Sequence, residues 1–349
     1  MRPWRHNRQS PIGNRQFSEL ALELFTLQFE HNPVYRKICD SRNLTPKTVG
    51  HWAQAPFVPT AAFKELELSS IPRGERTAVF HSSGTTEQKP SRHFHCPESL
   101  ALYEASLWQW FQTHFSVQNE FLFLTPSPSA APRSSLVRMF ETVRSRVKAA
   151  GFFGALAEDG AWLIDFDSVV RKLRRASGSG RPLTILGTAF SFVHLLDFLA
   201  ETDARFELPK DSRVMETGGY KNRSRTMPKD ELHAFITDRL GIPASDIICE
   251  YGMSELSSQA YDVVSENGAR VVARHFHFPP WARVQIISPE TGREVVDGET
   301  GLIRIFDLAN AFSVAAVQTE DLGIRRGDGF ELIGRARFAE PRGCSLMTA

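Results

Sequence analysis

Short apolar runs alternate with helical segments through the middle of this chain, and this alternation constrains the fold more than any other feature. The expected strands are residues 78–81, 121–125, 183–187, 213–217 and 247–250. The expected helices are residues 97–115, 134–149, 189–200 and 229–240. Strands and helices in alternation indicate crossover units, so we expect an α/β fold with a largely parallel sheet. Ligands of such sheets bind at the carboxyl ends of the strands.

The two ends of the chain have other patterns. Near the N-terminus, an amphipathic helical spacing is followed by Phe17, Leu20, Ala21, Leu24 and Leu27. After about residue 280, strand-like runs at 284–287, 301–306 and 330–333 are joined by turn residues, which predicts a small antiparallel section. We therefore expect a helical region at 1–75, an α/β core at 76–280, a β-rich subdomain at 281–335 and a tail at 336–349.

Composition and charge exclude several classes of protein. Of the 349 residues, 42% are hydrophobic and 23% are charged, which excludes wholesale disorder. The 41 Lys and Arg residues nearly balance 40 Asp and Glu residues, which argues against nucleic acid or an acidic membrane surface as partner. The most apolar stretch, residues 185–200, is interrupted by His194 and Asp197 and is too short to span a bilayer.

Four cysteines lie far apart, at Cys39, Cys96, Cys249 and Cys344. No two of them have the spacing of paired zinc ligands, and their number is too small for a disulfide framework. We expect the first three to be buried as small apolar residues and the protein to be cytoplasmic.

A polar segment follows the expected strand 78–81, with the sequence HSSGTTEQKP from His81 to Pro90. Its candidate anion-binding residues are Ser82, Ser83, Gly84, Thr85, Thr86 and Lys89. Backbone N–H groups and hydroxyls of such a loop can surround a polyphosphate, but the segment is not a Walker A loop. A simple polar turn between a strand and a helix explains it equally well.

A second segment, EYGMSE at 250–255, follows another expected strand. Tyr251 can stack on a base, Gly252 permits close approach, and Ser254 can bond a phosphate oxygen. Glu255 can hold Mg²⁺, which prefers carboxylate and phosphate oxygens. The alternative is a buried tyrosine beside a helix that Ser254 caps.

Two further segments are weak signals when taken alone. Gly218 and Gly219 follow the expected strand 213–217, where most glycine pairs only form turns. Asp321, in the sequence TEDLG, can accept both hydroxyls of a ribose, and Arg335 can complement phosphate charge. The alternative for Asp321 is an ordinary turn carboxylate.

In this order, the four segments resemble the motifs of the ANL superfamily of adenylate-forming enzymes. The phosphate motif of that superfamily reads S/T-S-G-S/T-T-G-x-x-K, and the adenine motif reads Y/F/W-G-x-S/T-E. The ribose motif reads T-G-D and precedes a G-R. Within it, the chain is most similar to the LuxE family of acyl-protein synthetases, from about residue 15 to 346. That similarity includes Pro59, Phe63, Lys64, Ser91, His93, Thr217–Lys221, Tyr251–Gln259, Tyr261, Asp262 and Arg342–Leu346.

The resemblance implies a large α/β domain of the adenylate-forming type and an ATP-dependent ligase that converts a carboxylic acid, here a fatty acid, to acyl-AMP. It implies that the ATP phosphates are held by Ser82, Ser83, Gly84, Thr85, Thr86 and Lys89. Gly218 and Gly219 would line the adenine pocket, and Tyr251 would stack on adenine. Ser254 would contact the α-phosphate, Glu255 would bind Mg²⁺, and Asp321 would bind the ribose, with Arg335 nearby.

The chain departs from the superfamily pattern at four places. Glu87 and Glu320 replace glycines of the phosphate and ribose motifs, and Arg337 replaces the hinge residue. The sequence ends at Ala349, so we expect the full mobile C-terminal domain, which carries a catalytic lysine, to be absent. These departures leave open a scaffold that binds nucleotide or a partner without chemistry.

The second half-reaction needs a nucleophile, and Cys344 is the candidate. Arg342 stands two residues before it, and a neighbouring cation favours the thiolate. The resemblance implies a thioester that is delivered to a partner such as a fatty-acid reductase. The alternatives are coenzyme A or an acyl-carrier protein as acceptor, and an ordinary exposed cysteine in a frayed tail.

Overall fold

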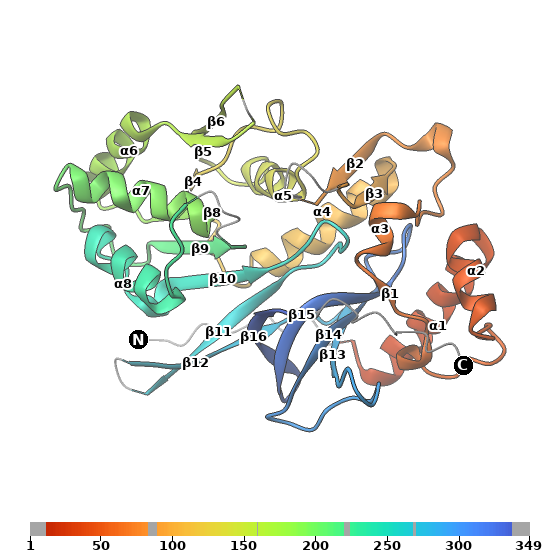
Figure 1. The fold of residues 1–349 in the computed structure, drawn as a ribbon. Helices are drawn as coiled ribbons and strands as arrows, with labels where there is room; N and C mark the ends of the chain where they lie inside the picture. The colour runs from red at the N-terminus through yellow and green to blue at the C-terminus, as the bar shows by residue number, and fades with distance from the viewer. Residues whose placement is uncertain (1–11, 83–88, 159, 220–223, 268–269, 337–349) are drawn as a thin grey trace, which may run out of the picture.

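A computed structural model describes residues 12–82, 89–158, 160–219, 224–267 and 270–336, and it confirms the α/β class (Figure 1). The helices are α1 (Asn14–His31), α2 (Pro33–Ser41), α3 (Ala62–Glu65), α4 (Pro97–Phe111), α5 (Ser135–Arg144), α6 (Phe166–Ser179), α7 (Ala189–Glu201) and α8 (Lys229–Leu240). Short 3₁₀ turns are η1 (Trp52–Gln54), η2 (Arg73–Glu75) and η3 (Ala244–Asp246).

The strands of the first half are β1 (Val58–Pro59), β2 (Ala78–His81), β3 (Arg92–His95), β4 (Glu120–Phe123), β5 (Ala150–Phe152), β6 (Gly154–Leu156), β7 (Trp162–Ile164) and β8 (Leu183–Thr188). Those of the second half are β9 (Arg213–Thr217), β10 (Ile247–Tyr251), β11 (Ala260–Asn267), β12 (Arg270–His277), β13 (Ala282–Ile287), β14 (Thr300–Asp307), β15 (Ala316–Arg326) and β16 (Gly329–Arg335). Among the described helices, none is long and apolar enough to cross a membrane.

One 12-stranded mixed sheet runs through the molecule, in the order β13-β14-β15-β16-β12-β11-β10-β9-β8-β4-β5, with β1 beside β15. The strands β5, β4, β8, β9 and β10 are parallel, as the alternation predicted. From β10 onward every further step of this path is antiparallel. The antiparallel part is larger than expected and begins at Ala260. The division of the chain into regions, with a boundary at residue 280, stays a prediction.

The parallel strands carry apolar side chains on both faces, which is typical of a sheet covered by helices on each side. Leu122, Ile185 and Val214 pack with residues of α6, α7 and α8. Their neighbours along the strands pack on the opposite face with α4 and α5. The two faces of β9 and β10 therefore present different side chains to different helices.

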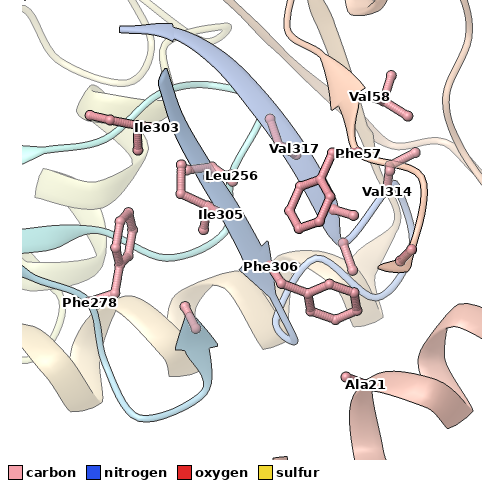
Figure 2. Close-up of a cluster of buried hydrophobic side chains, with 14 of the residues drawn as sticks. Ala21, Phe57, Val58, Leu256, Phe278, Ile303, Ile305, Phe306, Val314 and Val317 are labelled. Atoms are coloured by element: carbon pink, nitrogen blue, oxygen red, sulfur yellow. The ribbon is translucent and has the colours of Figure 1, made fainter. Parts of the chain in front are cut away.

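The N-terminal helices pack against the antiparallel half of the sheet and share its core. Figure 2 shows this cluster, in which Phe57 and Val58 lie near Val317 and Phe306. The strand β1 adds to β15 through the pairing of Val58 with Val317.

Three expected elements differ from the structure. The strand β2 is not part of the large sheet, because it forms an antiparallel hairpin with β3, pairing Ala78 with His95. The expected helix 134–149 ends at Arg144, and the chain continues into β5 at Ala150, which pairs with Phe121 of β4. The expected helix 97–115 ends at Phe111.

Candidate active site

The β2–β3 hairpin holds the two ends of the polar Ser/Gly/Thr segment side by side. The backbone N–H of Ser91 donates to Oγ of Ser82 at 2.9 Å, and the N–H of Ser82 donates to the carbonyl of Ser91 at 3.3 Å. The residues Ser83, Gly84, Thr85, Thr86 and Glu87 lie outside the described residues. The segment is therefore a hairpin connection rather than a turn from a strand into a helix.

The loop after β10 reaches this hairpin through Glu255. Its carboxylate accepts hydrogen bonds from Oγ of Ser91 on Oε1 and from Oγ of Ser254 on Oε2, the latter at 2.9 Å. Nδ1 of His93 lies 2.8 Å from the carbonyl oxygen of Ser254, so this nitrogen carries the proton. All four side chains are buried. The hairpin that flanks the first sequence motif thus meets the second motif directly, through residues at least 161 positions apart.

The neighbourhood of Glu255 suits a hard cation. Among the described residues, no Lys, Arg or His side chain forms an ion pair with this carboxylate. A carboxylate flanked by two serine hydroxyls offers the oxygen donors that Mg²⁺ prefers. Burial lowers the pKa of His93 to about 4, so this nearby imidazole adds no positive charge at neutral pH.

A second junction joins β10 to β15. The hydroxyl of Tyr251 donates to Oδ2 of Asp321 at 2.9 Å, and Nε of Arg335 lies 3.8 Å from Oδ1. Burial raises the pKa of Asp321, although the Tyr251 hydrogen bond acts in the opposite direction. Tyr251 is 7% exposed, and its ring makes edge contacts with Phe276 and Phe330. The expected adenine and ribose residues are therefore neighbours.

The glycines of the site differ in what surrounds them. Gly218 has φ +69° after β9, and a Cβ at Gly218 or Gly219 would meet no described heavy atom within 4 Å. Space beside both glycines is consistent with a ligand. At Gly252, by contrast, a Cβ would overlap Oε1 of Glu250. The close approach that glycine permits at position 252 is therefore between the backbone and the side chain of Glu250.

Comparison with known proteins identifies the family. The model of the family "Acyl-protein synthetase, LuxE" matches residues 2–349. This chain belongs to the LuxE family.

Two relatives of this LuxE-family chain are long-chain-fatty-acid–luciferin-component ligases. The protein from Aliivibrio fischeri is 23% identical over 366 residues, covering 99% of this chain and 90% of the relative. The protein from Vibrio harveyi is 22% identical, covering 94% of this chain and 86% of the relative. The family makes this chain a ligase of the acyl-protein synthetase type.

Solved structures of adenylate-forming enzymes share the fold. An open conformation of 2-hydroxyisobutyryl-CoA ligase superposes with a TM-score of 0.66 and 14% identity, over 92% of this chain and 74% of that one. ATP-bound MatB from Rhodopseudomonas palustris gives a TM-score of 0.52 and 18% identity, over 87% of this chain and 58% of that one. The expected adenylate-forming architecture is confirmed.

Lys89, a candidate catalytic residue of the LuxE-family chain, stands apart from these junctions. Nζ of Lys89, which lies between β2 and β3, forms an exposed ion pair with Oε2 of Glu65 at 2.8 Å. Exchanging this partner for a phosphate would cost little, because exposed ion pairs contribute about 0–1 kcal/mol. Cys344 lies outside the described residues.

Glu250 is a further residue of the site, to which its sequence motif assigned no role. It is buried, and its Oε2 accepts a hydrogen bond from the hydroxyl of Thr217 on the neighbouring strand. Burial raises its pKa to about 7, with a further contribution from the charge of Glu216. Its position at the carboxyl end of a parallel strand was the only available signal.

Proposed function

We propose that this chain uses ATP to convert a long-chain fatty acid to acyl-AMP and then transfers the acyl group to a protein thiol. The observation that carries the proposal is that three separate segments, the β2–β3 hairpin, the loop after β10 and the strand β15, meet near the carboxyl end of β10. Ser91 and Ser254 meet at Glu255, and Tyr251 meets Asp321. The fatty acid is the substrate class in the names of the two curated relatives.

The first step forms a mixed anhydride. A carboxylate oxygen of the acid attacks the α-phosphorus of ATP, the bond to the bridging oxygen breaks, and pyrophosphate leaves. The attack joins two anions, so donors placed around the developing charge supply the largest catalytic contribution. In this proposal Ser82, Ser83, Gly84, Thr85, Thr86 and Lys89 hold the phosphates, Gly218 and Gly219 border the adenine, and Asp321 with Arg335 holds the ribose. Mg²⁺, when bound at Glu255, neutralises phosphate charge.

The second step transfers the acyl group. A thiolate attacks the acyl carbon, and AMP leaves with the electron pair of the broken C–O bond. The proposed thiol is that of Cys344, next to Arg342 in the sequence, and the proposed final recipient is a fatty-acid reductase or acyl-carrier partner. A positive neighbour favours the thiolate form that the attack requires.

Pyrophosphate exchange tests the first step. We expect radiolabel from pyrophosphate to enter ATP in the presence of fatty acids of some chain length and of Mg²⁺. A panel of fatty and aromatic acids defines the substrate class. Binding of ATP without exchange for any acid would contradict the proposal and favour a non-catalytic scaffold.

Labelling with a radioactive fatty acid tests the second step. We expect a hydroxylamine-sensitive label on the wild-type chain and its loss in Cys344→Ser, with pyrophosphate exchange unchanged. The adjacent variant Ser345→Ala is the matched control and should keep the label. A label that persists in Cys344→Ser would assign the acceptor role to another thiol, such as that of coenzyme A or a carrier protein.

A further inference from the structure

A buried cluster of potential metal ligands lies behind the loops of the candidate active site. Glu216 of β9 and Cys249 of β10 are paired neighbours in the parallel sheet, and His233 of α8 covers them. The exposed fractions of the three residues are 3%, 0% and 3%, respectively. The three donor atoms all lie within 4.8 Å of one another. Side chains alternate along a strand, so this cluster faces away from Thr217 and Glu250.

Both contacts of the His233 imidazole within the cluster are long, since the one to sulfur is near the outer limit of a hydrogen bond and the one to the carboxylate is beyond it. Nε2 of His233 lies 3.8 Å from Sγ of Cys249 and 3.7 Å from Oε2 of Glu216. Within the described part of the chain, no hydrogen-bond donor reaches this carboxylate oxygen, although it is buried. A buried acceptor without a donor is costly, so the arrangement lacks a component that would satisfy it.

Ligands around a tetrahedral zinc ion have a spacing close to the one observed. With Zn–N and Zn–O bonds of about 2.1 Å and a Zn–S bond of about 2.3 Å, neighbouring donors lie roughly 3.4–3.7 Å apart. Thiolate, imidazole and carboxylate are the three side-chain groups that zinc selects. We propose that Glu216, His233 and Cys249 bind a zinc ion, which leaves one coordination position for a further ligand.

Two cations next to the cluster define the competing explanation. Nζ of Lys229 lies 3.9 Å from Oε2 of Glu216, and an Arg274 nitrogen lies 3.9 Å from Sγ of Cys249. Arg274 already pairs with Asp262 at 2.8 Å, whereas Lys229 is exposed and contacts the ring of Phe276. Without a metal, the charge of Glu216 would be balanced by Lys229 at 3.9 Å and by Arg274, which already pairs with Asp262.

The proposed ion would fix the elements that carry the candidate nucleotide-binding loops. Glu216 stands two residues before Gly218, and Cys249 stands two residues before Tyr251. A metal bond to each strand and to α8 would hold the carboxyl ends of β9 and β10 at a constant separation. The inferred role is therefore to position the site rather than to take part in the chemistry, and it does not depend on the identity of the acyl substrate.

Metal analysis and cobalt substitution test the proposal on the full chain, purified without a histidine tag. We expect about one zinc per chain by mass spectrometry. After exchange for Co²⁺, a thiolate-to-cobalt charge-transfer band should appear. Cys249→Ser should abolish the band, and His233→Gln should weaken Co²⁺ binding at least about 10-fold, because even losing a partner of a ligand costs that much. Cys96→Ser and Cys344→Ser are the matched thiol controls and should retain the band.

Lys229→Met separates the two explanations even if the ligand variants fail to fold. A zinc site should bind Co²⁺ more tightly in this variant, because a competing positive charge has been removed. A metal-free charge network should instead show a lower thermal midpoint and no cobalt band. Folded wild-type protein with neither bound zinc nor a cobalt band would overturn the proposal.

Discussion

Glu250 and Glu255 are both buried near the end of β10, but they have different partners. Glu255 accepts hydrogen bonds from two serine hydroxyls, one of which belongs to the distant β2–β3 hairpin. Glu250 accepts from the hydroxyl of Thr217 and lies close to the charge of Glu216. The oxygen-rich surroundings of the first residue suit a bound cation, whereas burial raises the pKa of the second to about 7.

Replacing Glu255 with Gln tests the first of these roles. The amide keeps the size of the side chain but removes the charge that would hold Mg²⁺. We expect pyrophosphate exchange to fall by about 10²–10³-fold, the range found when one group that stabilises the transition state is removed. Glu290→Gln, an exposed carboxylate of a turn, is the control and should leave exchange unchanged. An active Glu255→Gln enzyme with an unaltered Mg²⁺ requirement would refute the assignment.

Glu250 predicts a pH dependence of stability with a defined sign. Its pKa is about 7 in the folded chain, against an ordinary value of 4.5. Between these values the folded state keeps a proton that the unfolded state has lost, so the free energy of unfolding falls as pH rises. Above pH 7 the loss is complete.

The variant Glu250→Gln should remove this fall. The stability of the variant relative to wild type should increase by on the order of 1–3 kcal/mol between pH 4.5 and pH 8. Urea unfolding at several pH values measures the difference. Asp307, whose pKa burial raises to about 6, is present in both proteins and cancels. Parallel pH profiles for the two proteins would show that Glu250 is ionised in the folded state at neutral pH.

At the scale of elements, the loop after β10 depends on a glycine. A Cβ at Gly252 would overlap Oε1 of Glu250, and it would also lie 3.3 Å from Cγ of Gln259. Because the carboxylate of Glu250 is itself held by Thr217, it has little room to move aside. The loop that carries Ser254 and Glu255 therefore follows its path only with glycine at this position.

Gly252→Ala should consequently be destabilising by about 1–3 kcal/mol, the usual cost of overpacking, and should also reduce pyrophosphate exchange. Gly178→Ala is the matched control. Gly178 lies within α6, where a Cβ would meet nothing within 4 Å, so alanine should stabilise the chain by about 0.5–1 kcal/mol. Chemical denaturation of both variants gives the comparison, and equal effects of the two substitutions would contradict this role of Gly252.

The elements that the sequence predicted are those with a strong local pattern. The helix α8 and the strand β9 have the expected bounds, because apolar periodicity and flanking turn residues mark both ends. The helix α6 was missed, although Val169, Leu173 and Ala176 form its buried stripe, because its other positions are mostly charged or small. The long hairpin of β11 and β12 was missed because its pairing partners become known only in three dimensions.

The candidate site likewise contains residues that the sequence indicates and contacts that it does not. Tyr251, Ser254, Glu255 and Asp321 stand in short motifs that a sequence can display. The pairing of Ser91 with Glu255 depends on the β2–β3 hairpin, which the sequence did not predict. Glu216, His233 and Cys249 stand 16 or more residues apart on three elements, so no local spacing indicates that they meet.

At the scale of the whole molecule, the first helix is tied to the last part of the sheet. Nε2 of Gln28 in α1 donates to the carbonyl of Asn310 at 2.9 Å, and its Oε1 accepts from the N–H of Ala315 at 3.0 Å. Nδ2 of Asn32 donates to the carbonyl of Ser313 at 3.3 Å. These bonds satisfy backbone N–H and carbonyl groups of the connection between β14 and β15, although the residues that form them are more than 280 positions apart. The strand β15 also carries Asp321.

Gln28→Ala should therefore destabilise the whole chain rather than unfold the N-terminal helices alone. Gln28 is buried, and its loss leaves backbone groups of the β14–β15 connection without partners, at about 1–3 kcal/mol in total. Gln16→Ala, on an exposed position of the same helix, removes a similar side chain and should change stability by less than about 0.5 kcal/mol.

Urea unfolding followed by both tryptophan fluorescence and circular dichroism should give one coincident transition that shifts in Gln28→Ala. Two separate transitions would show that the N-terminal helices fold independently of the sheet, and the hydrogen bonds of Gln28 would then contribute only to their docking.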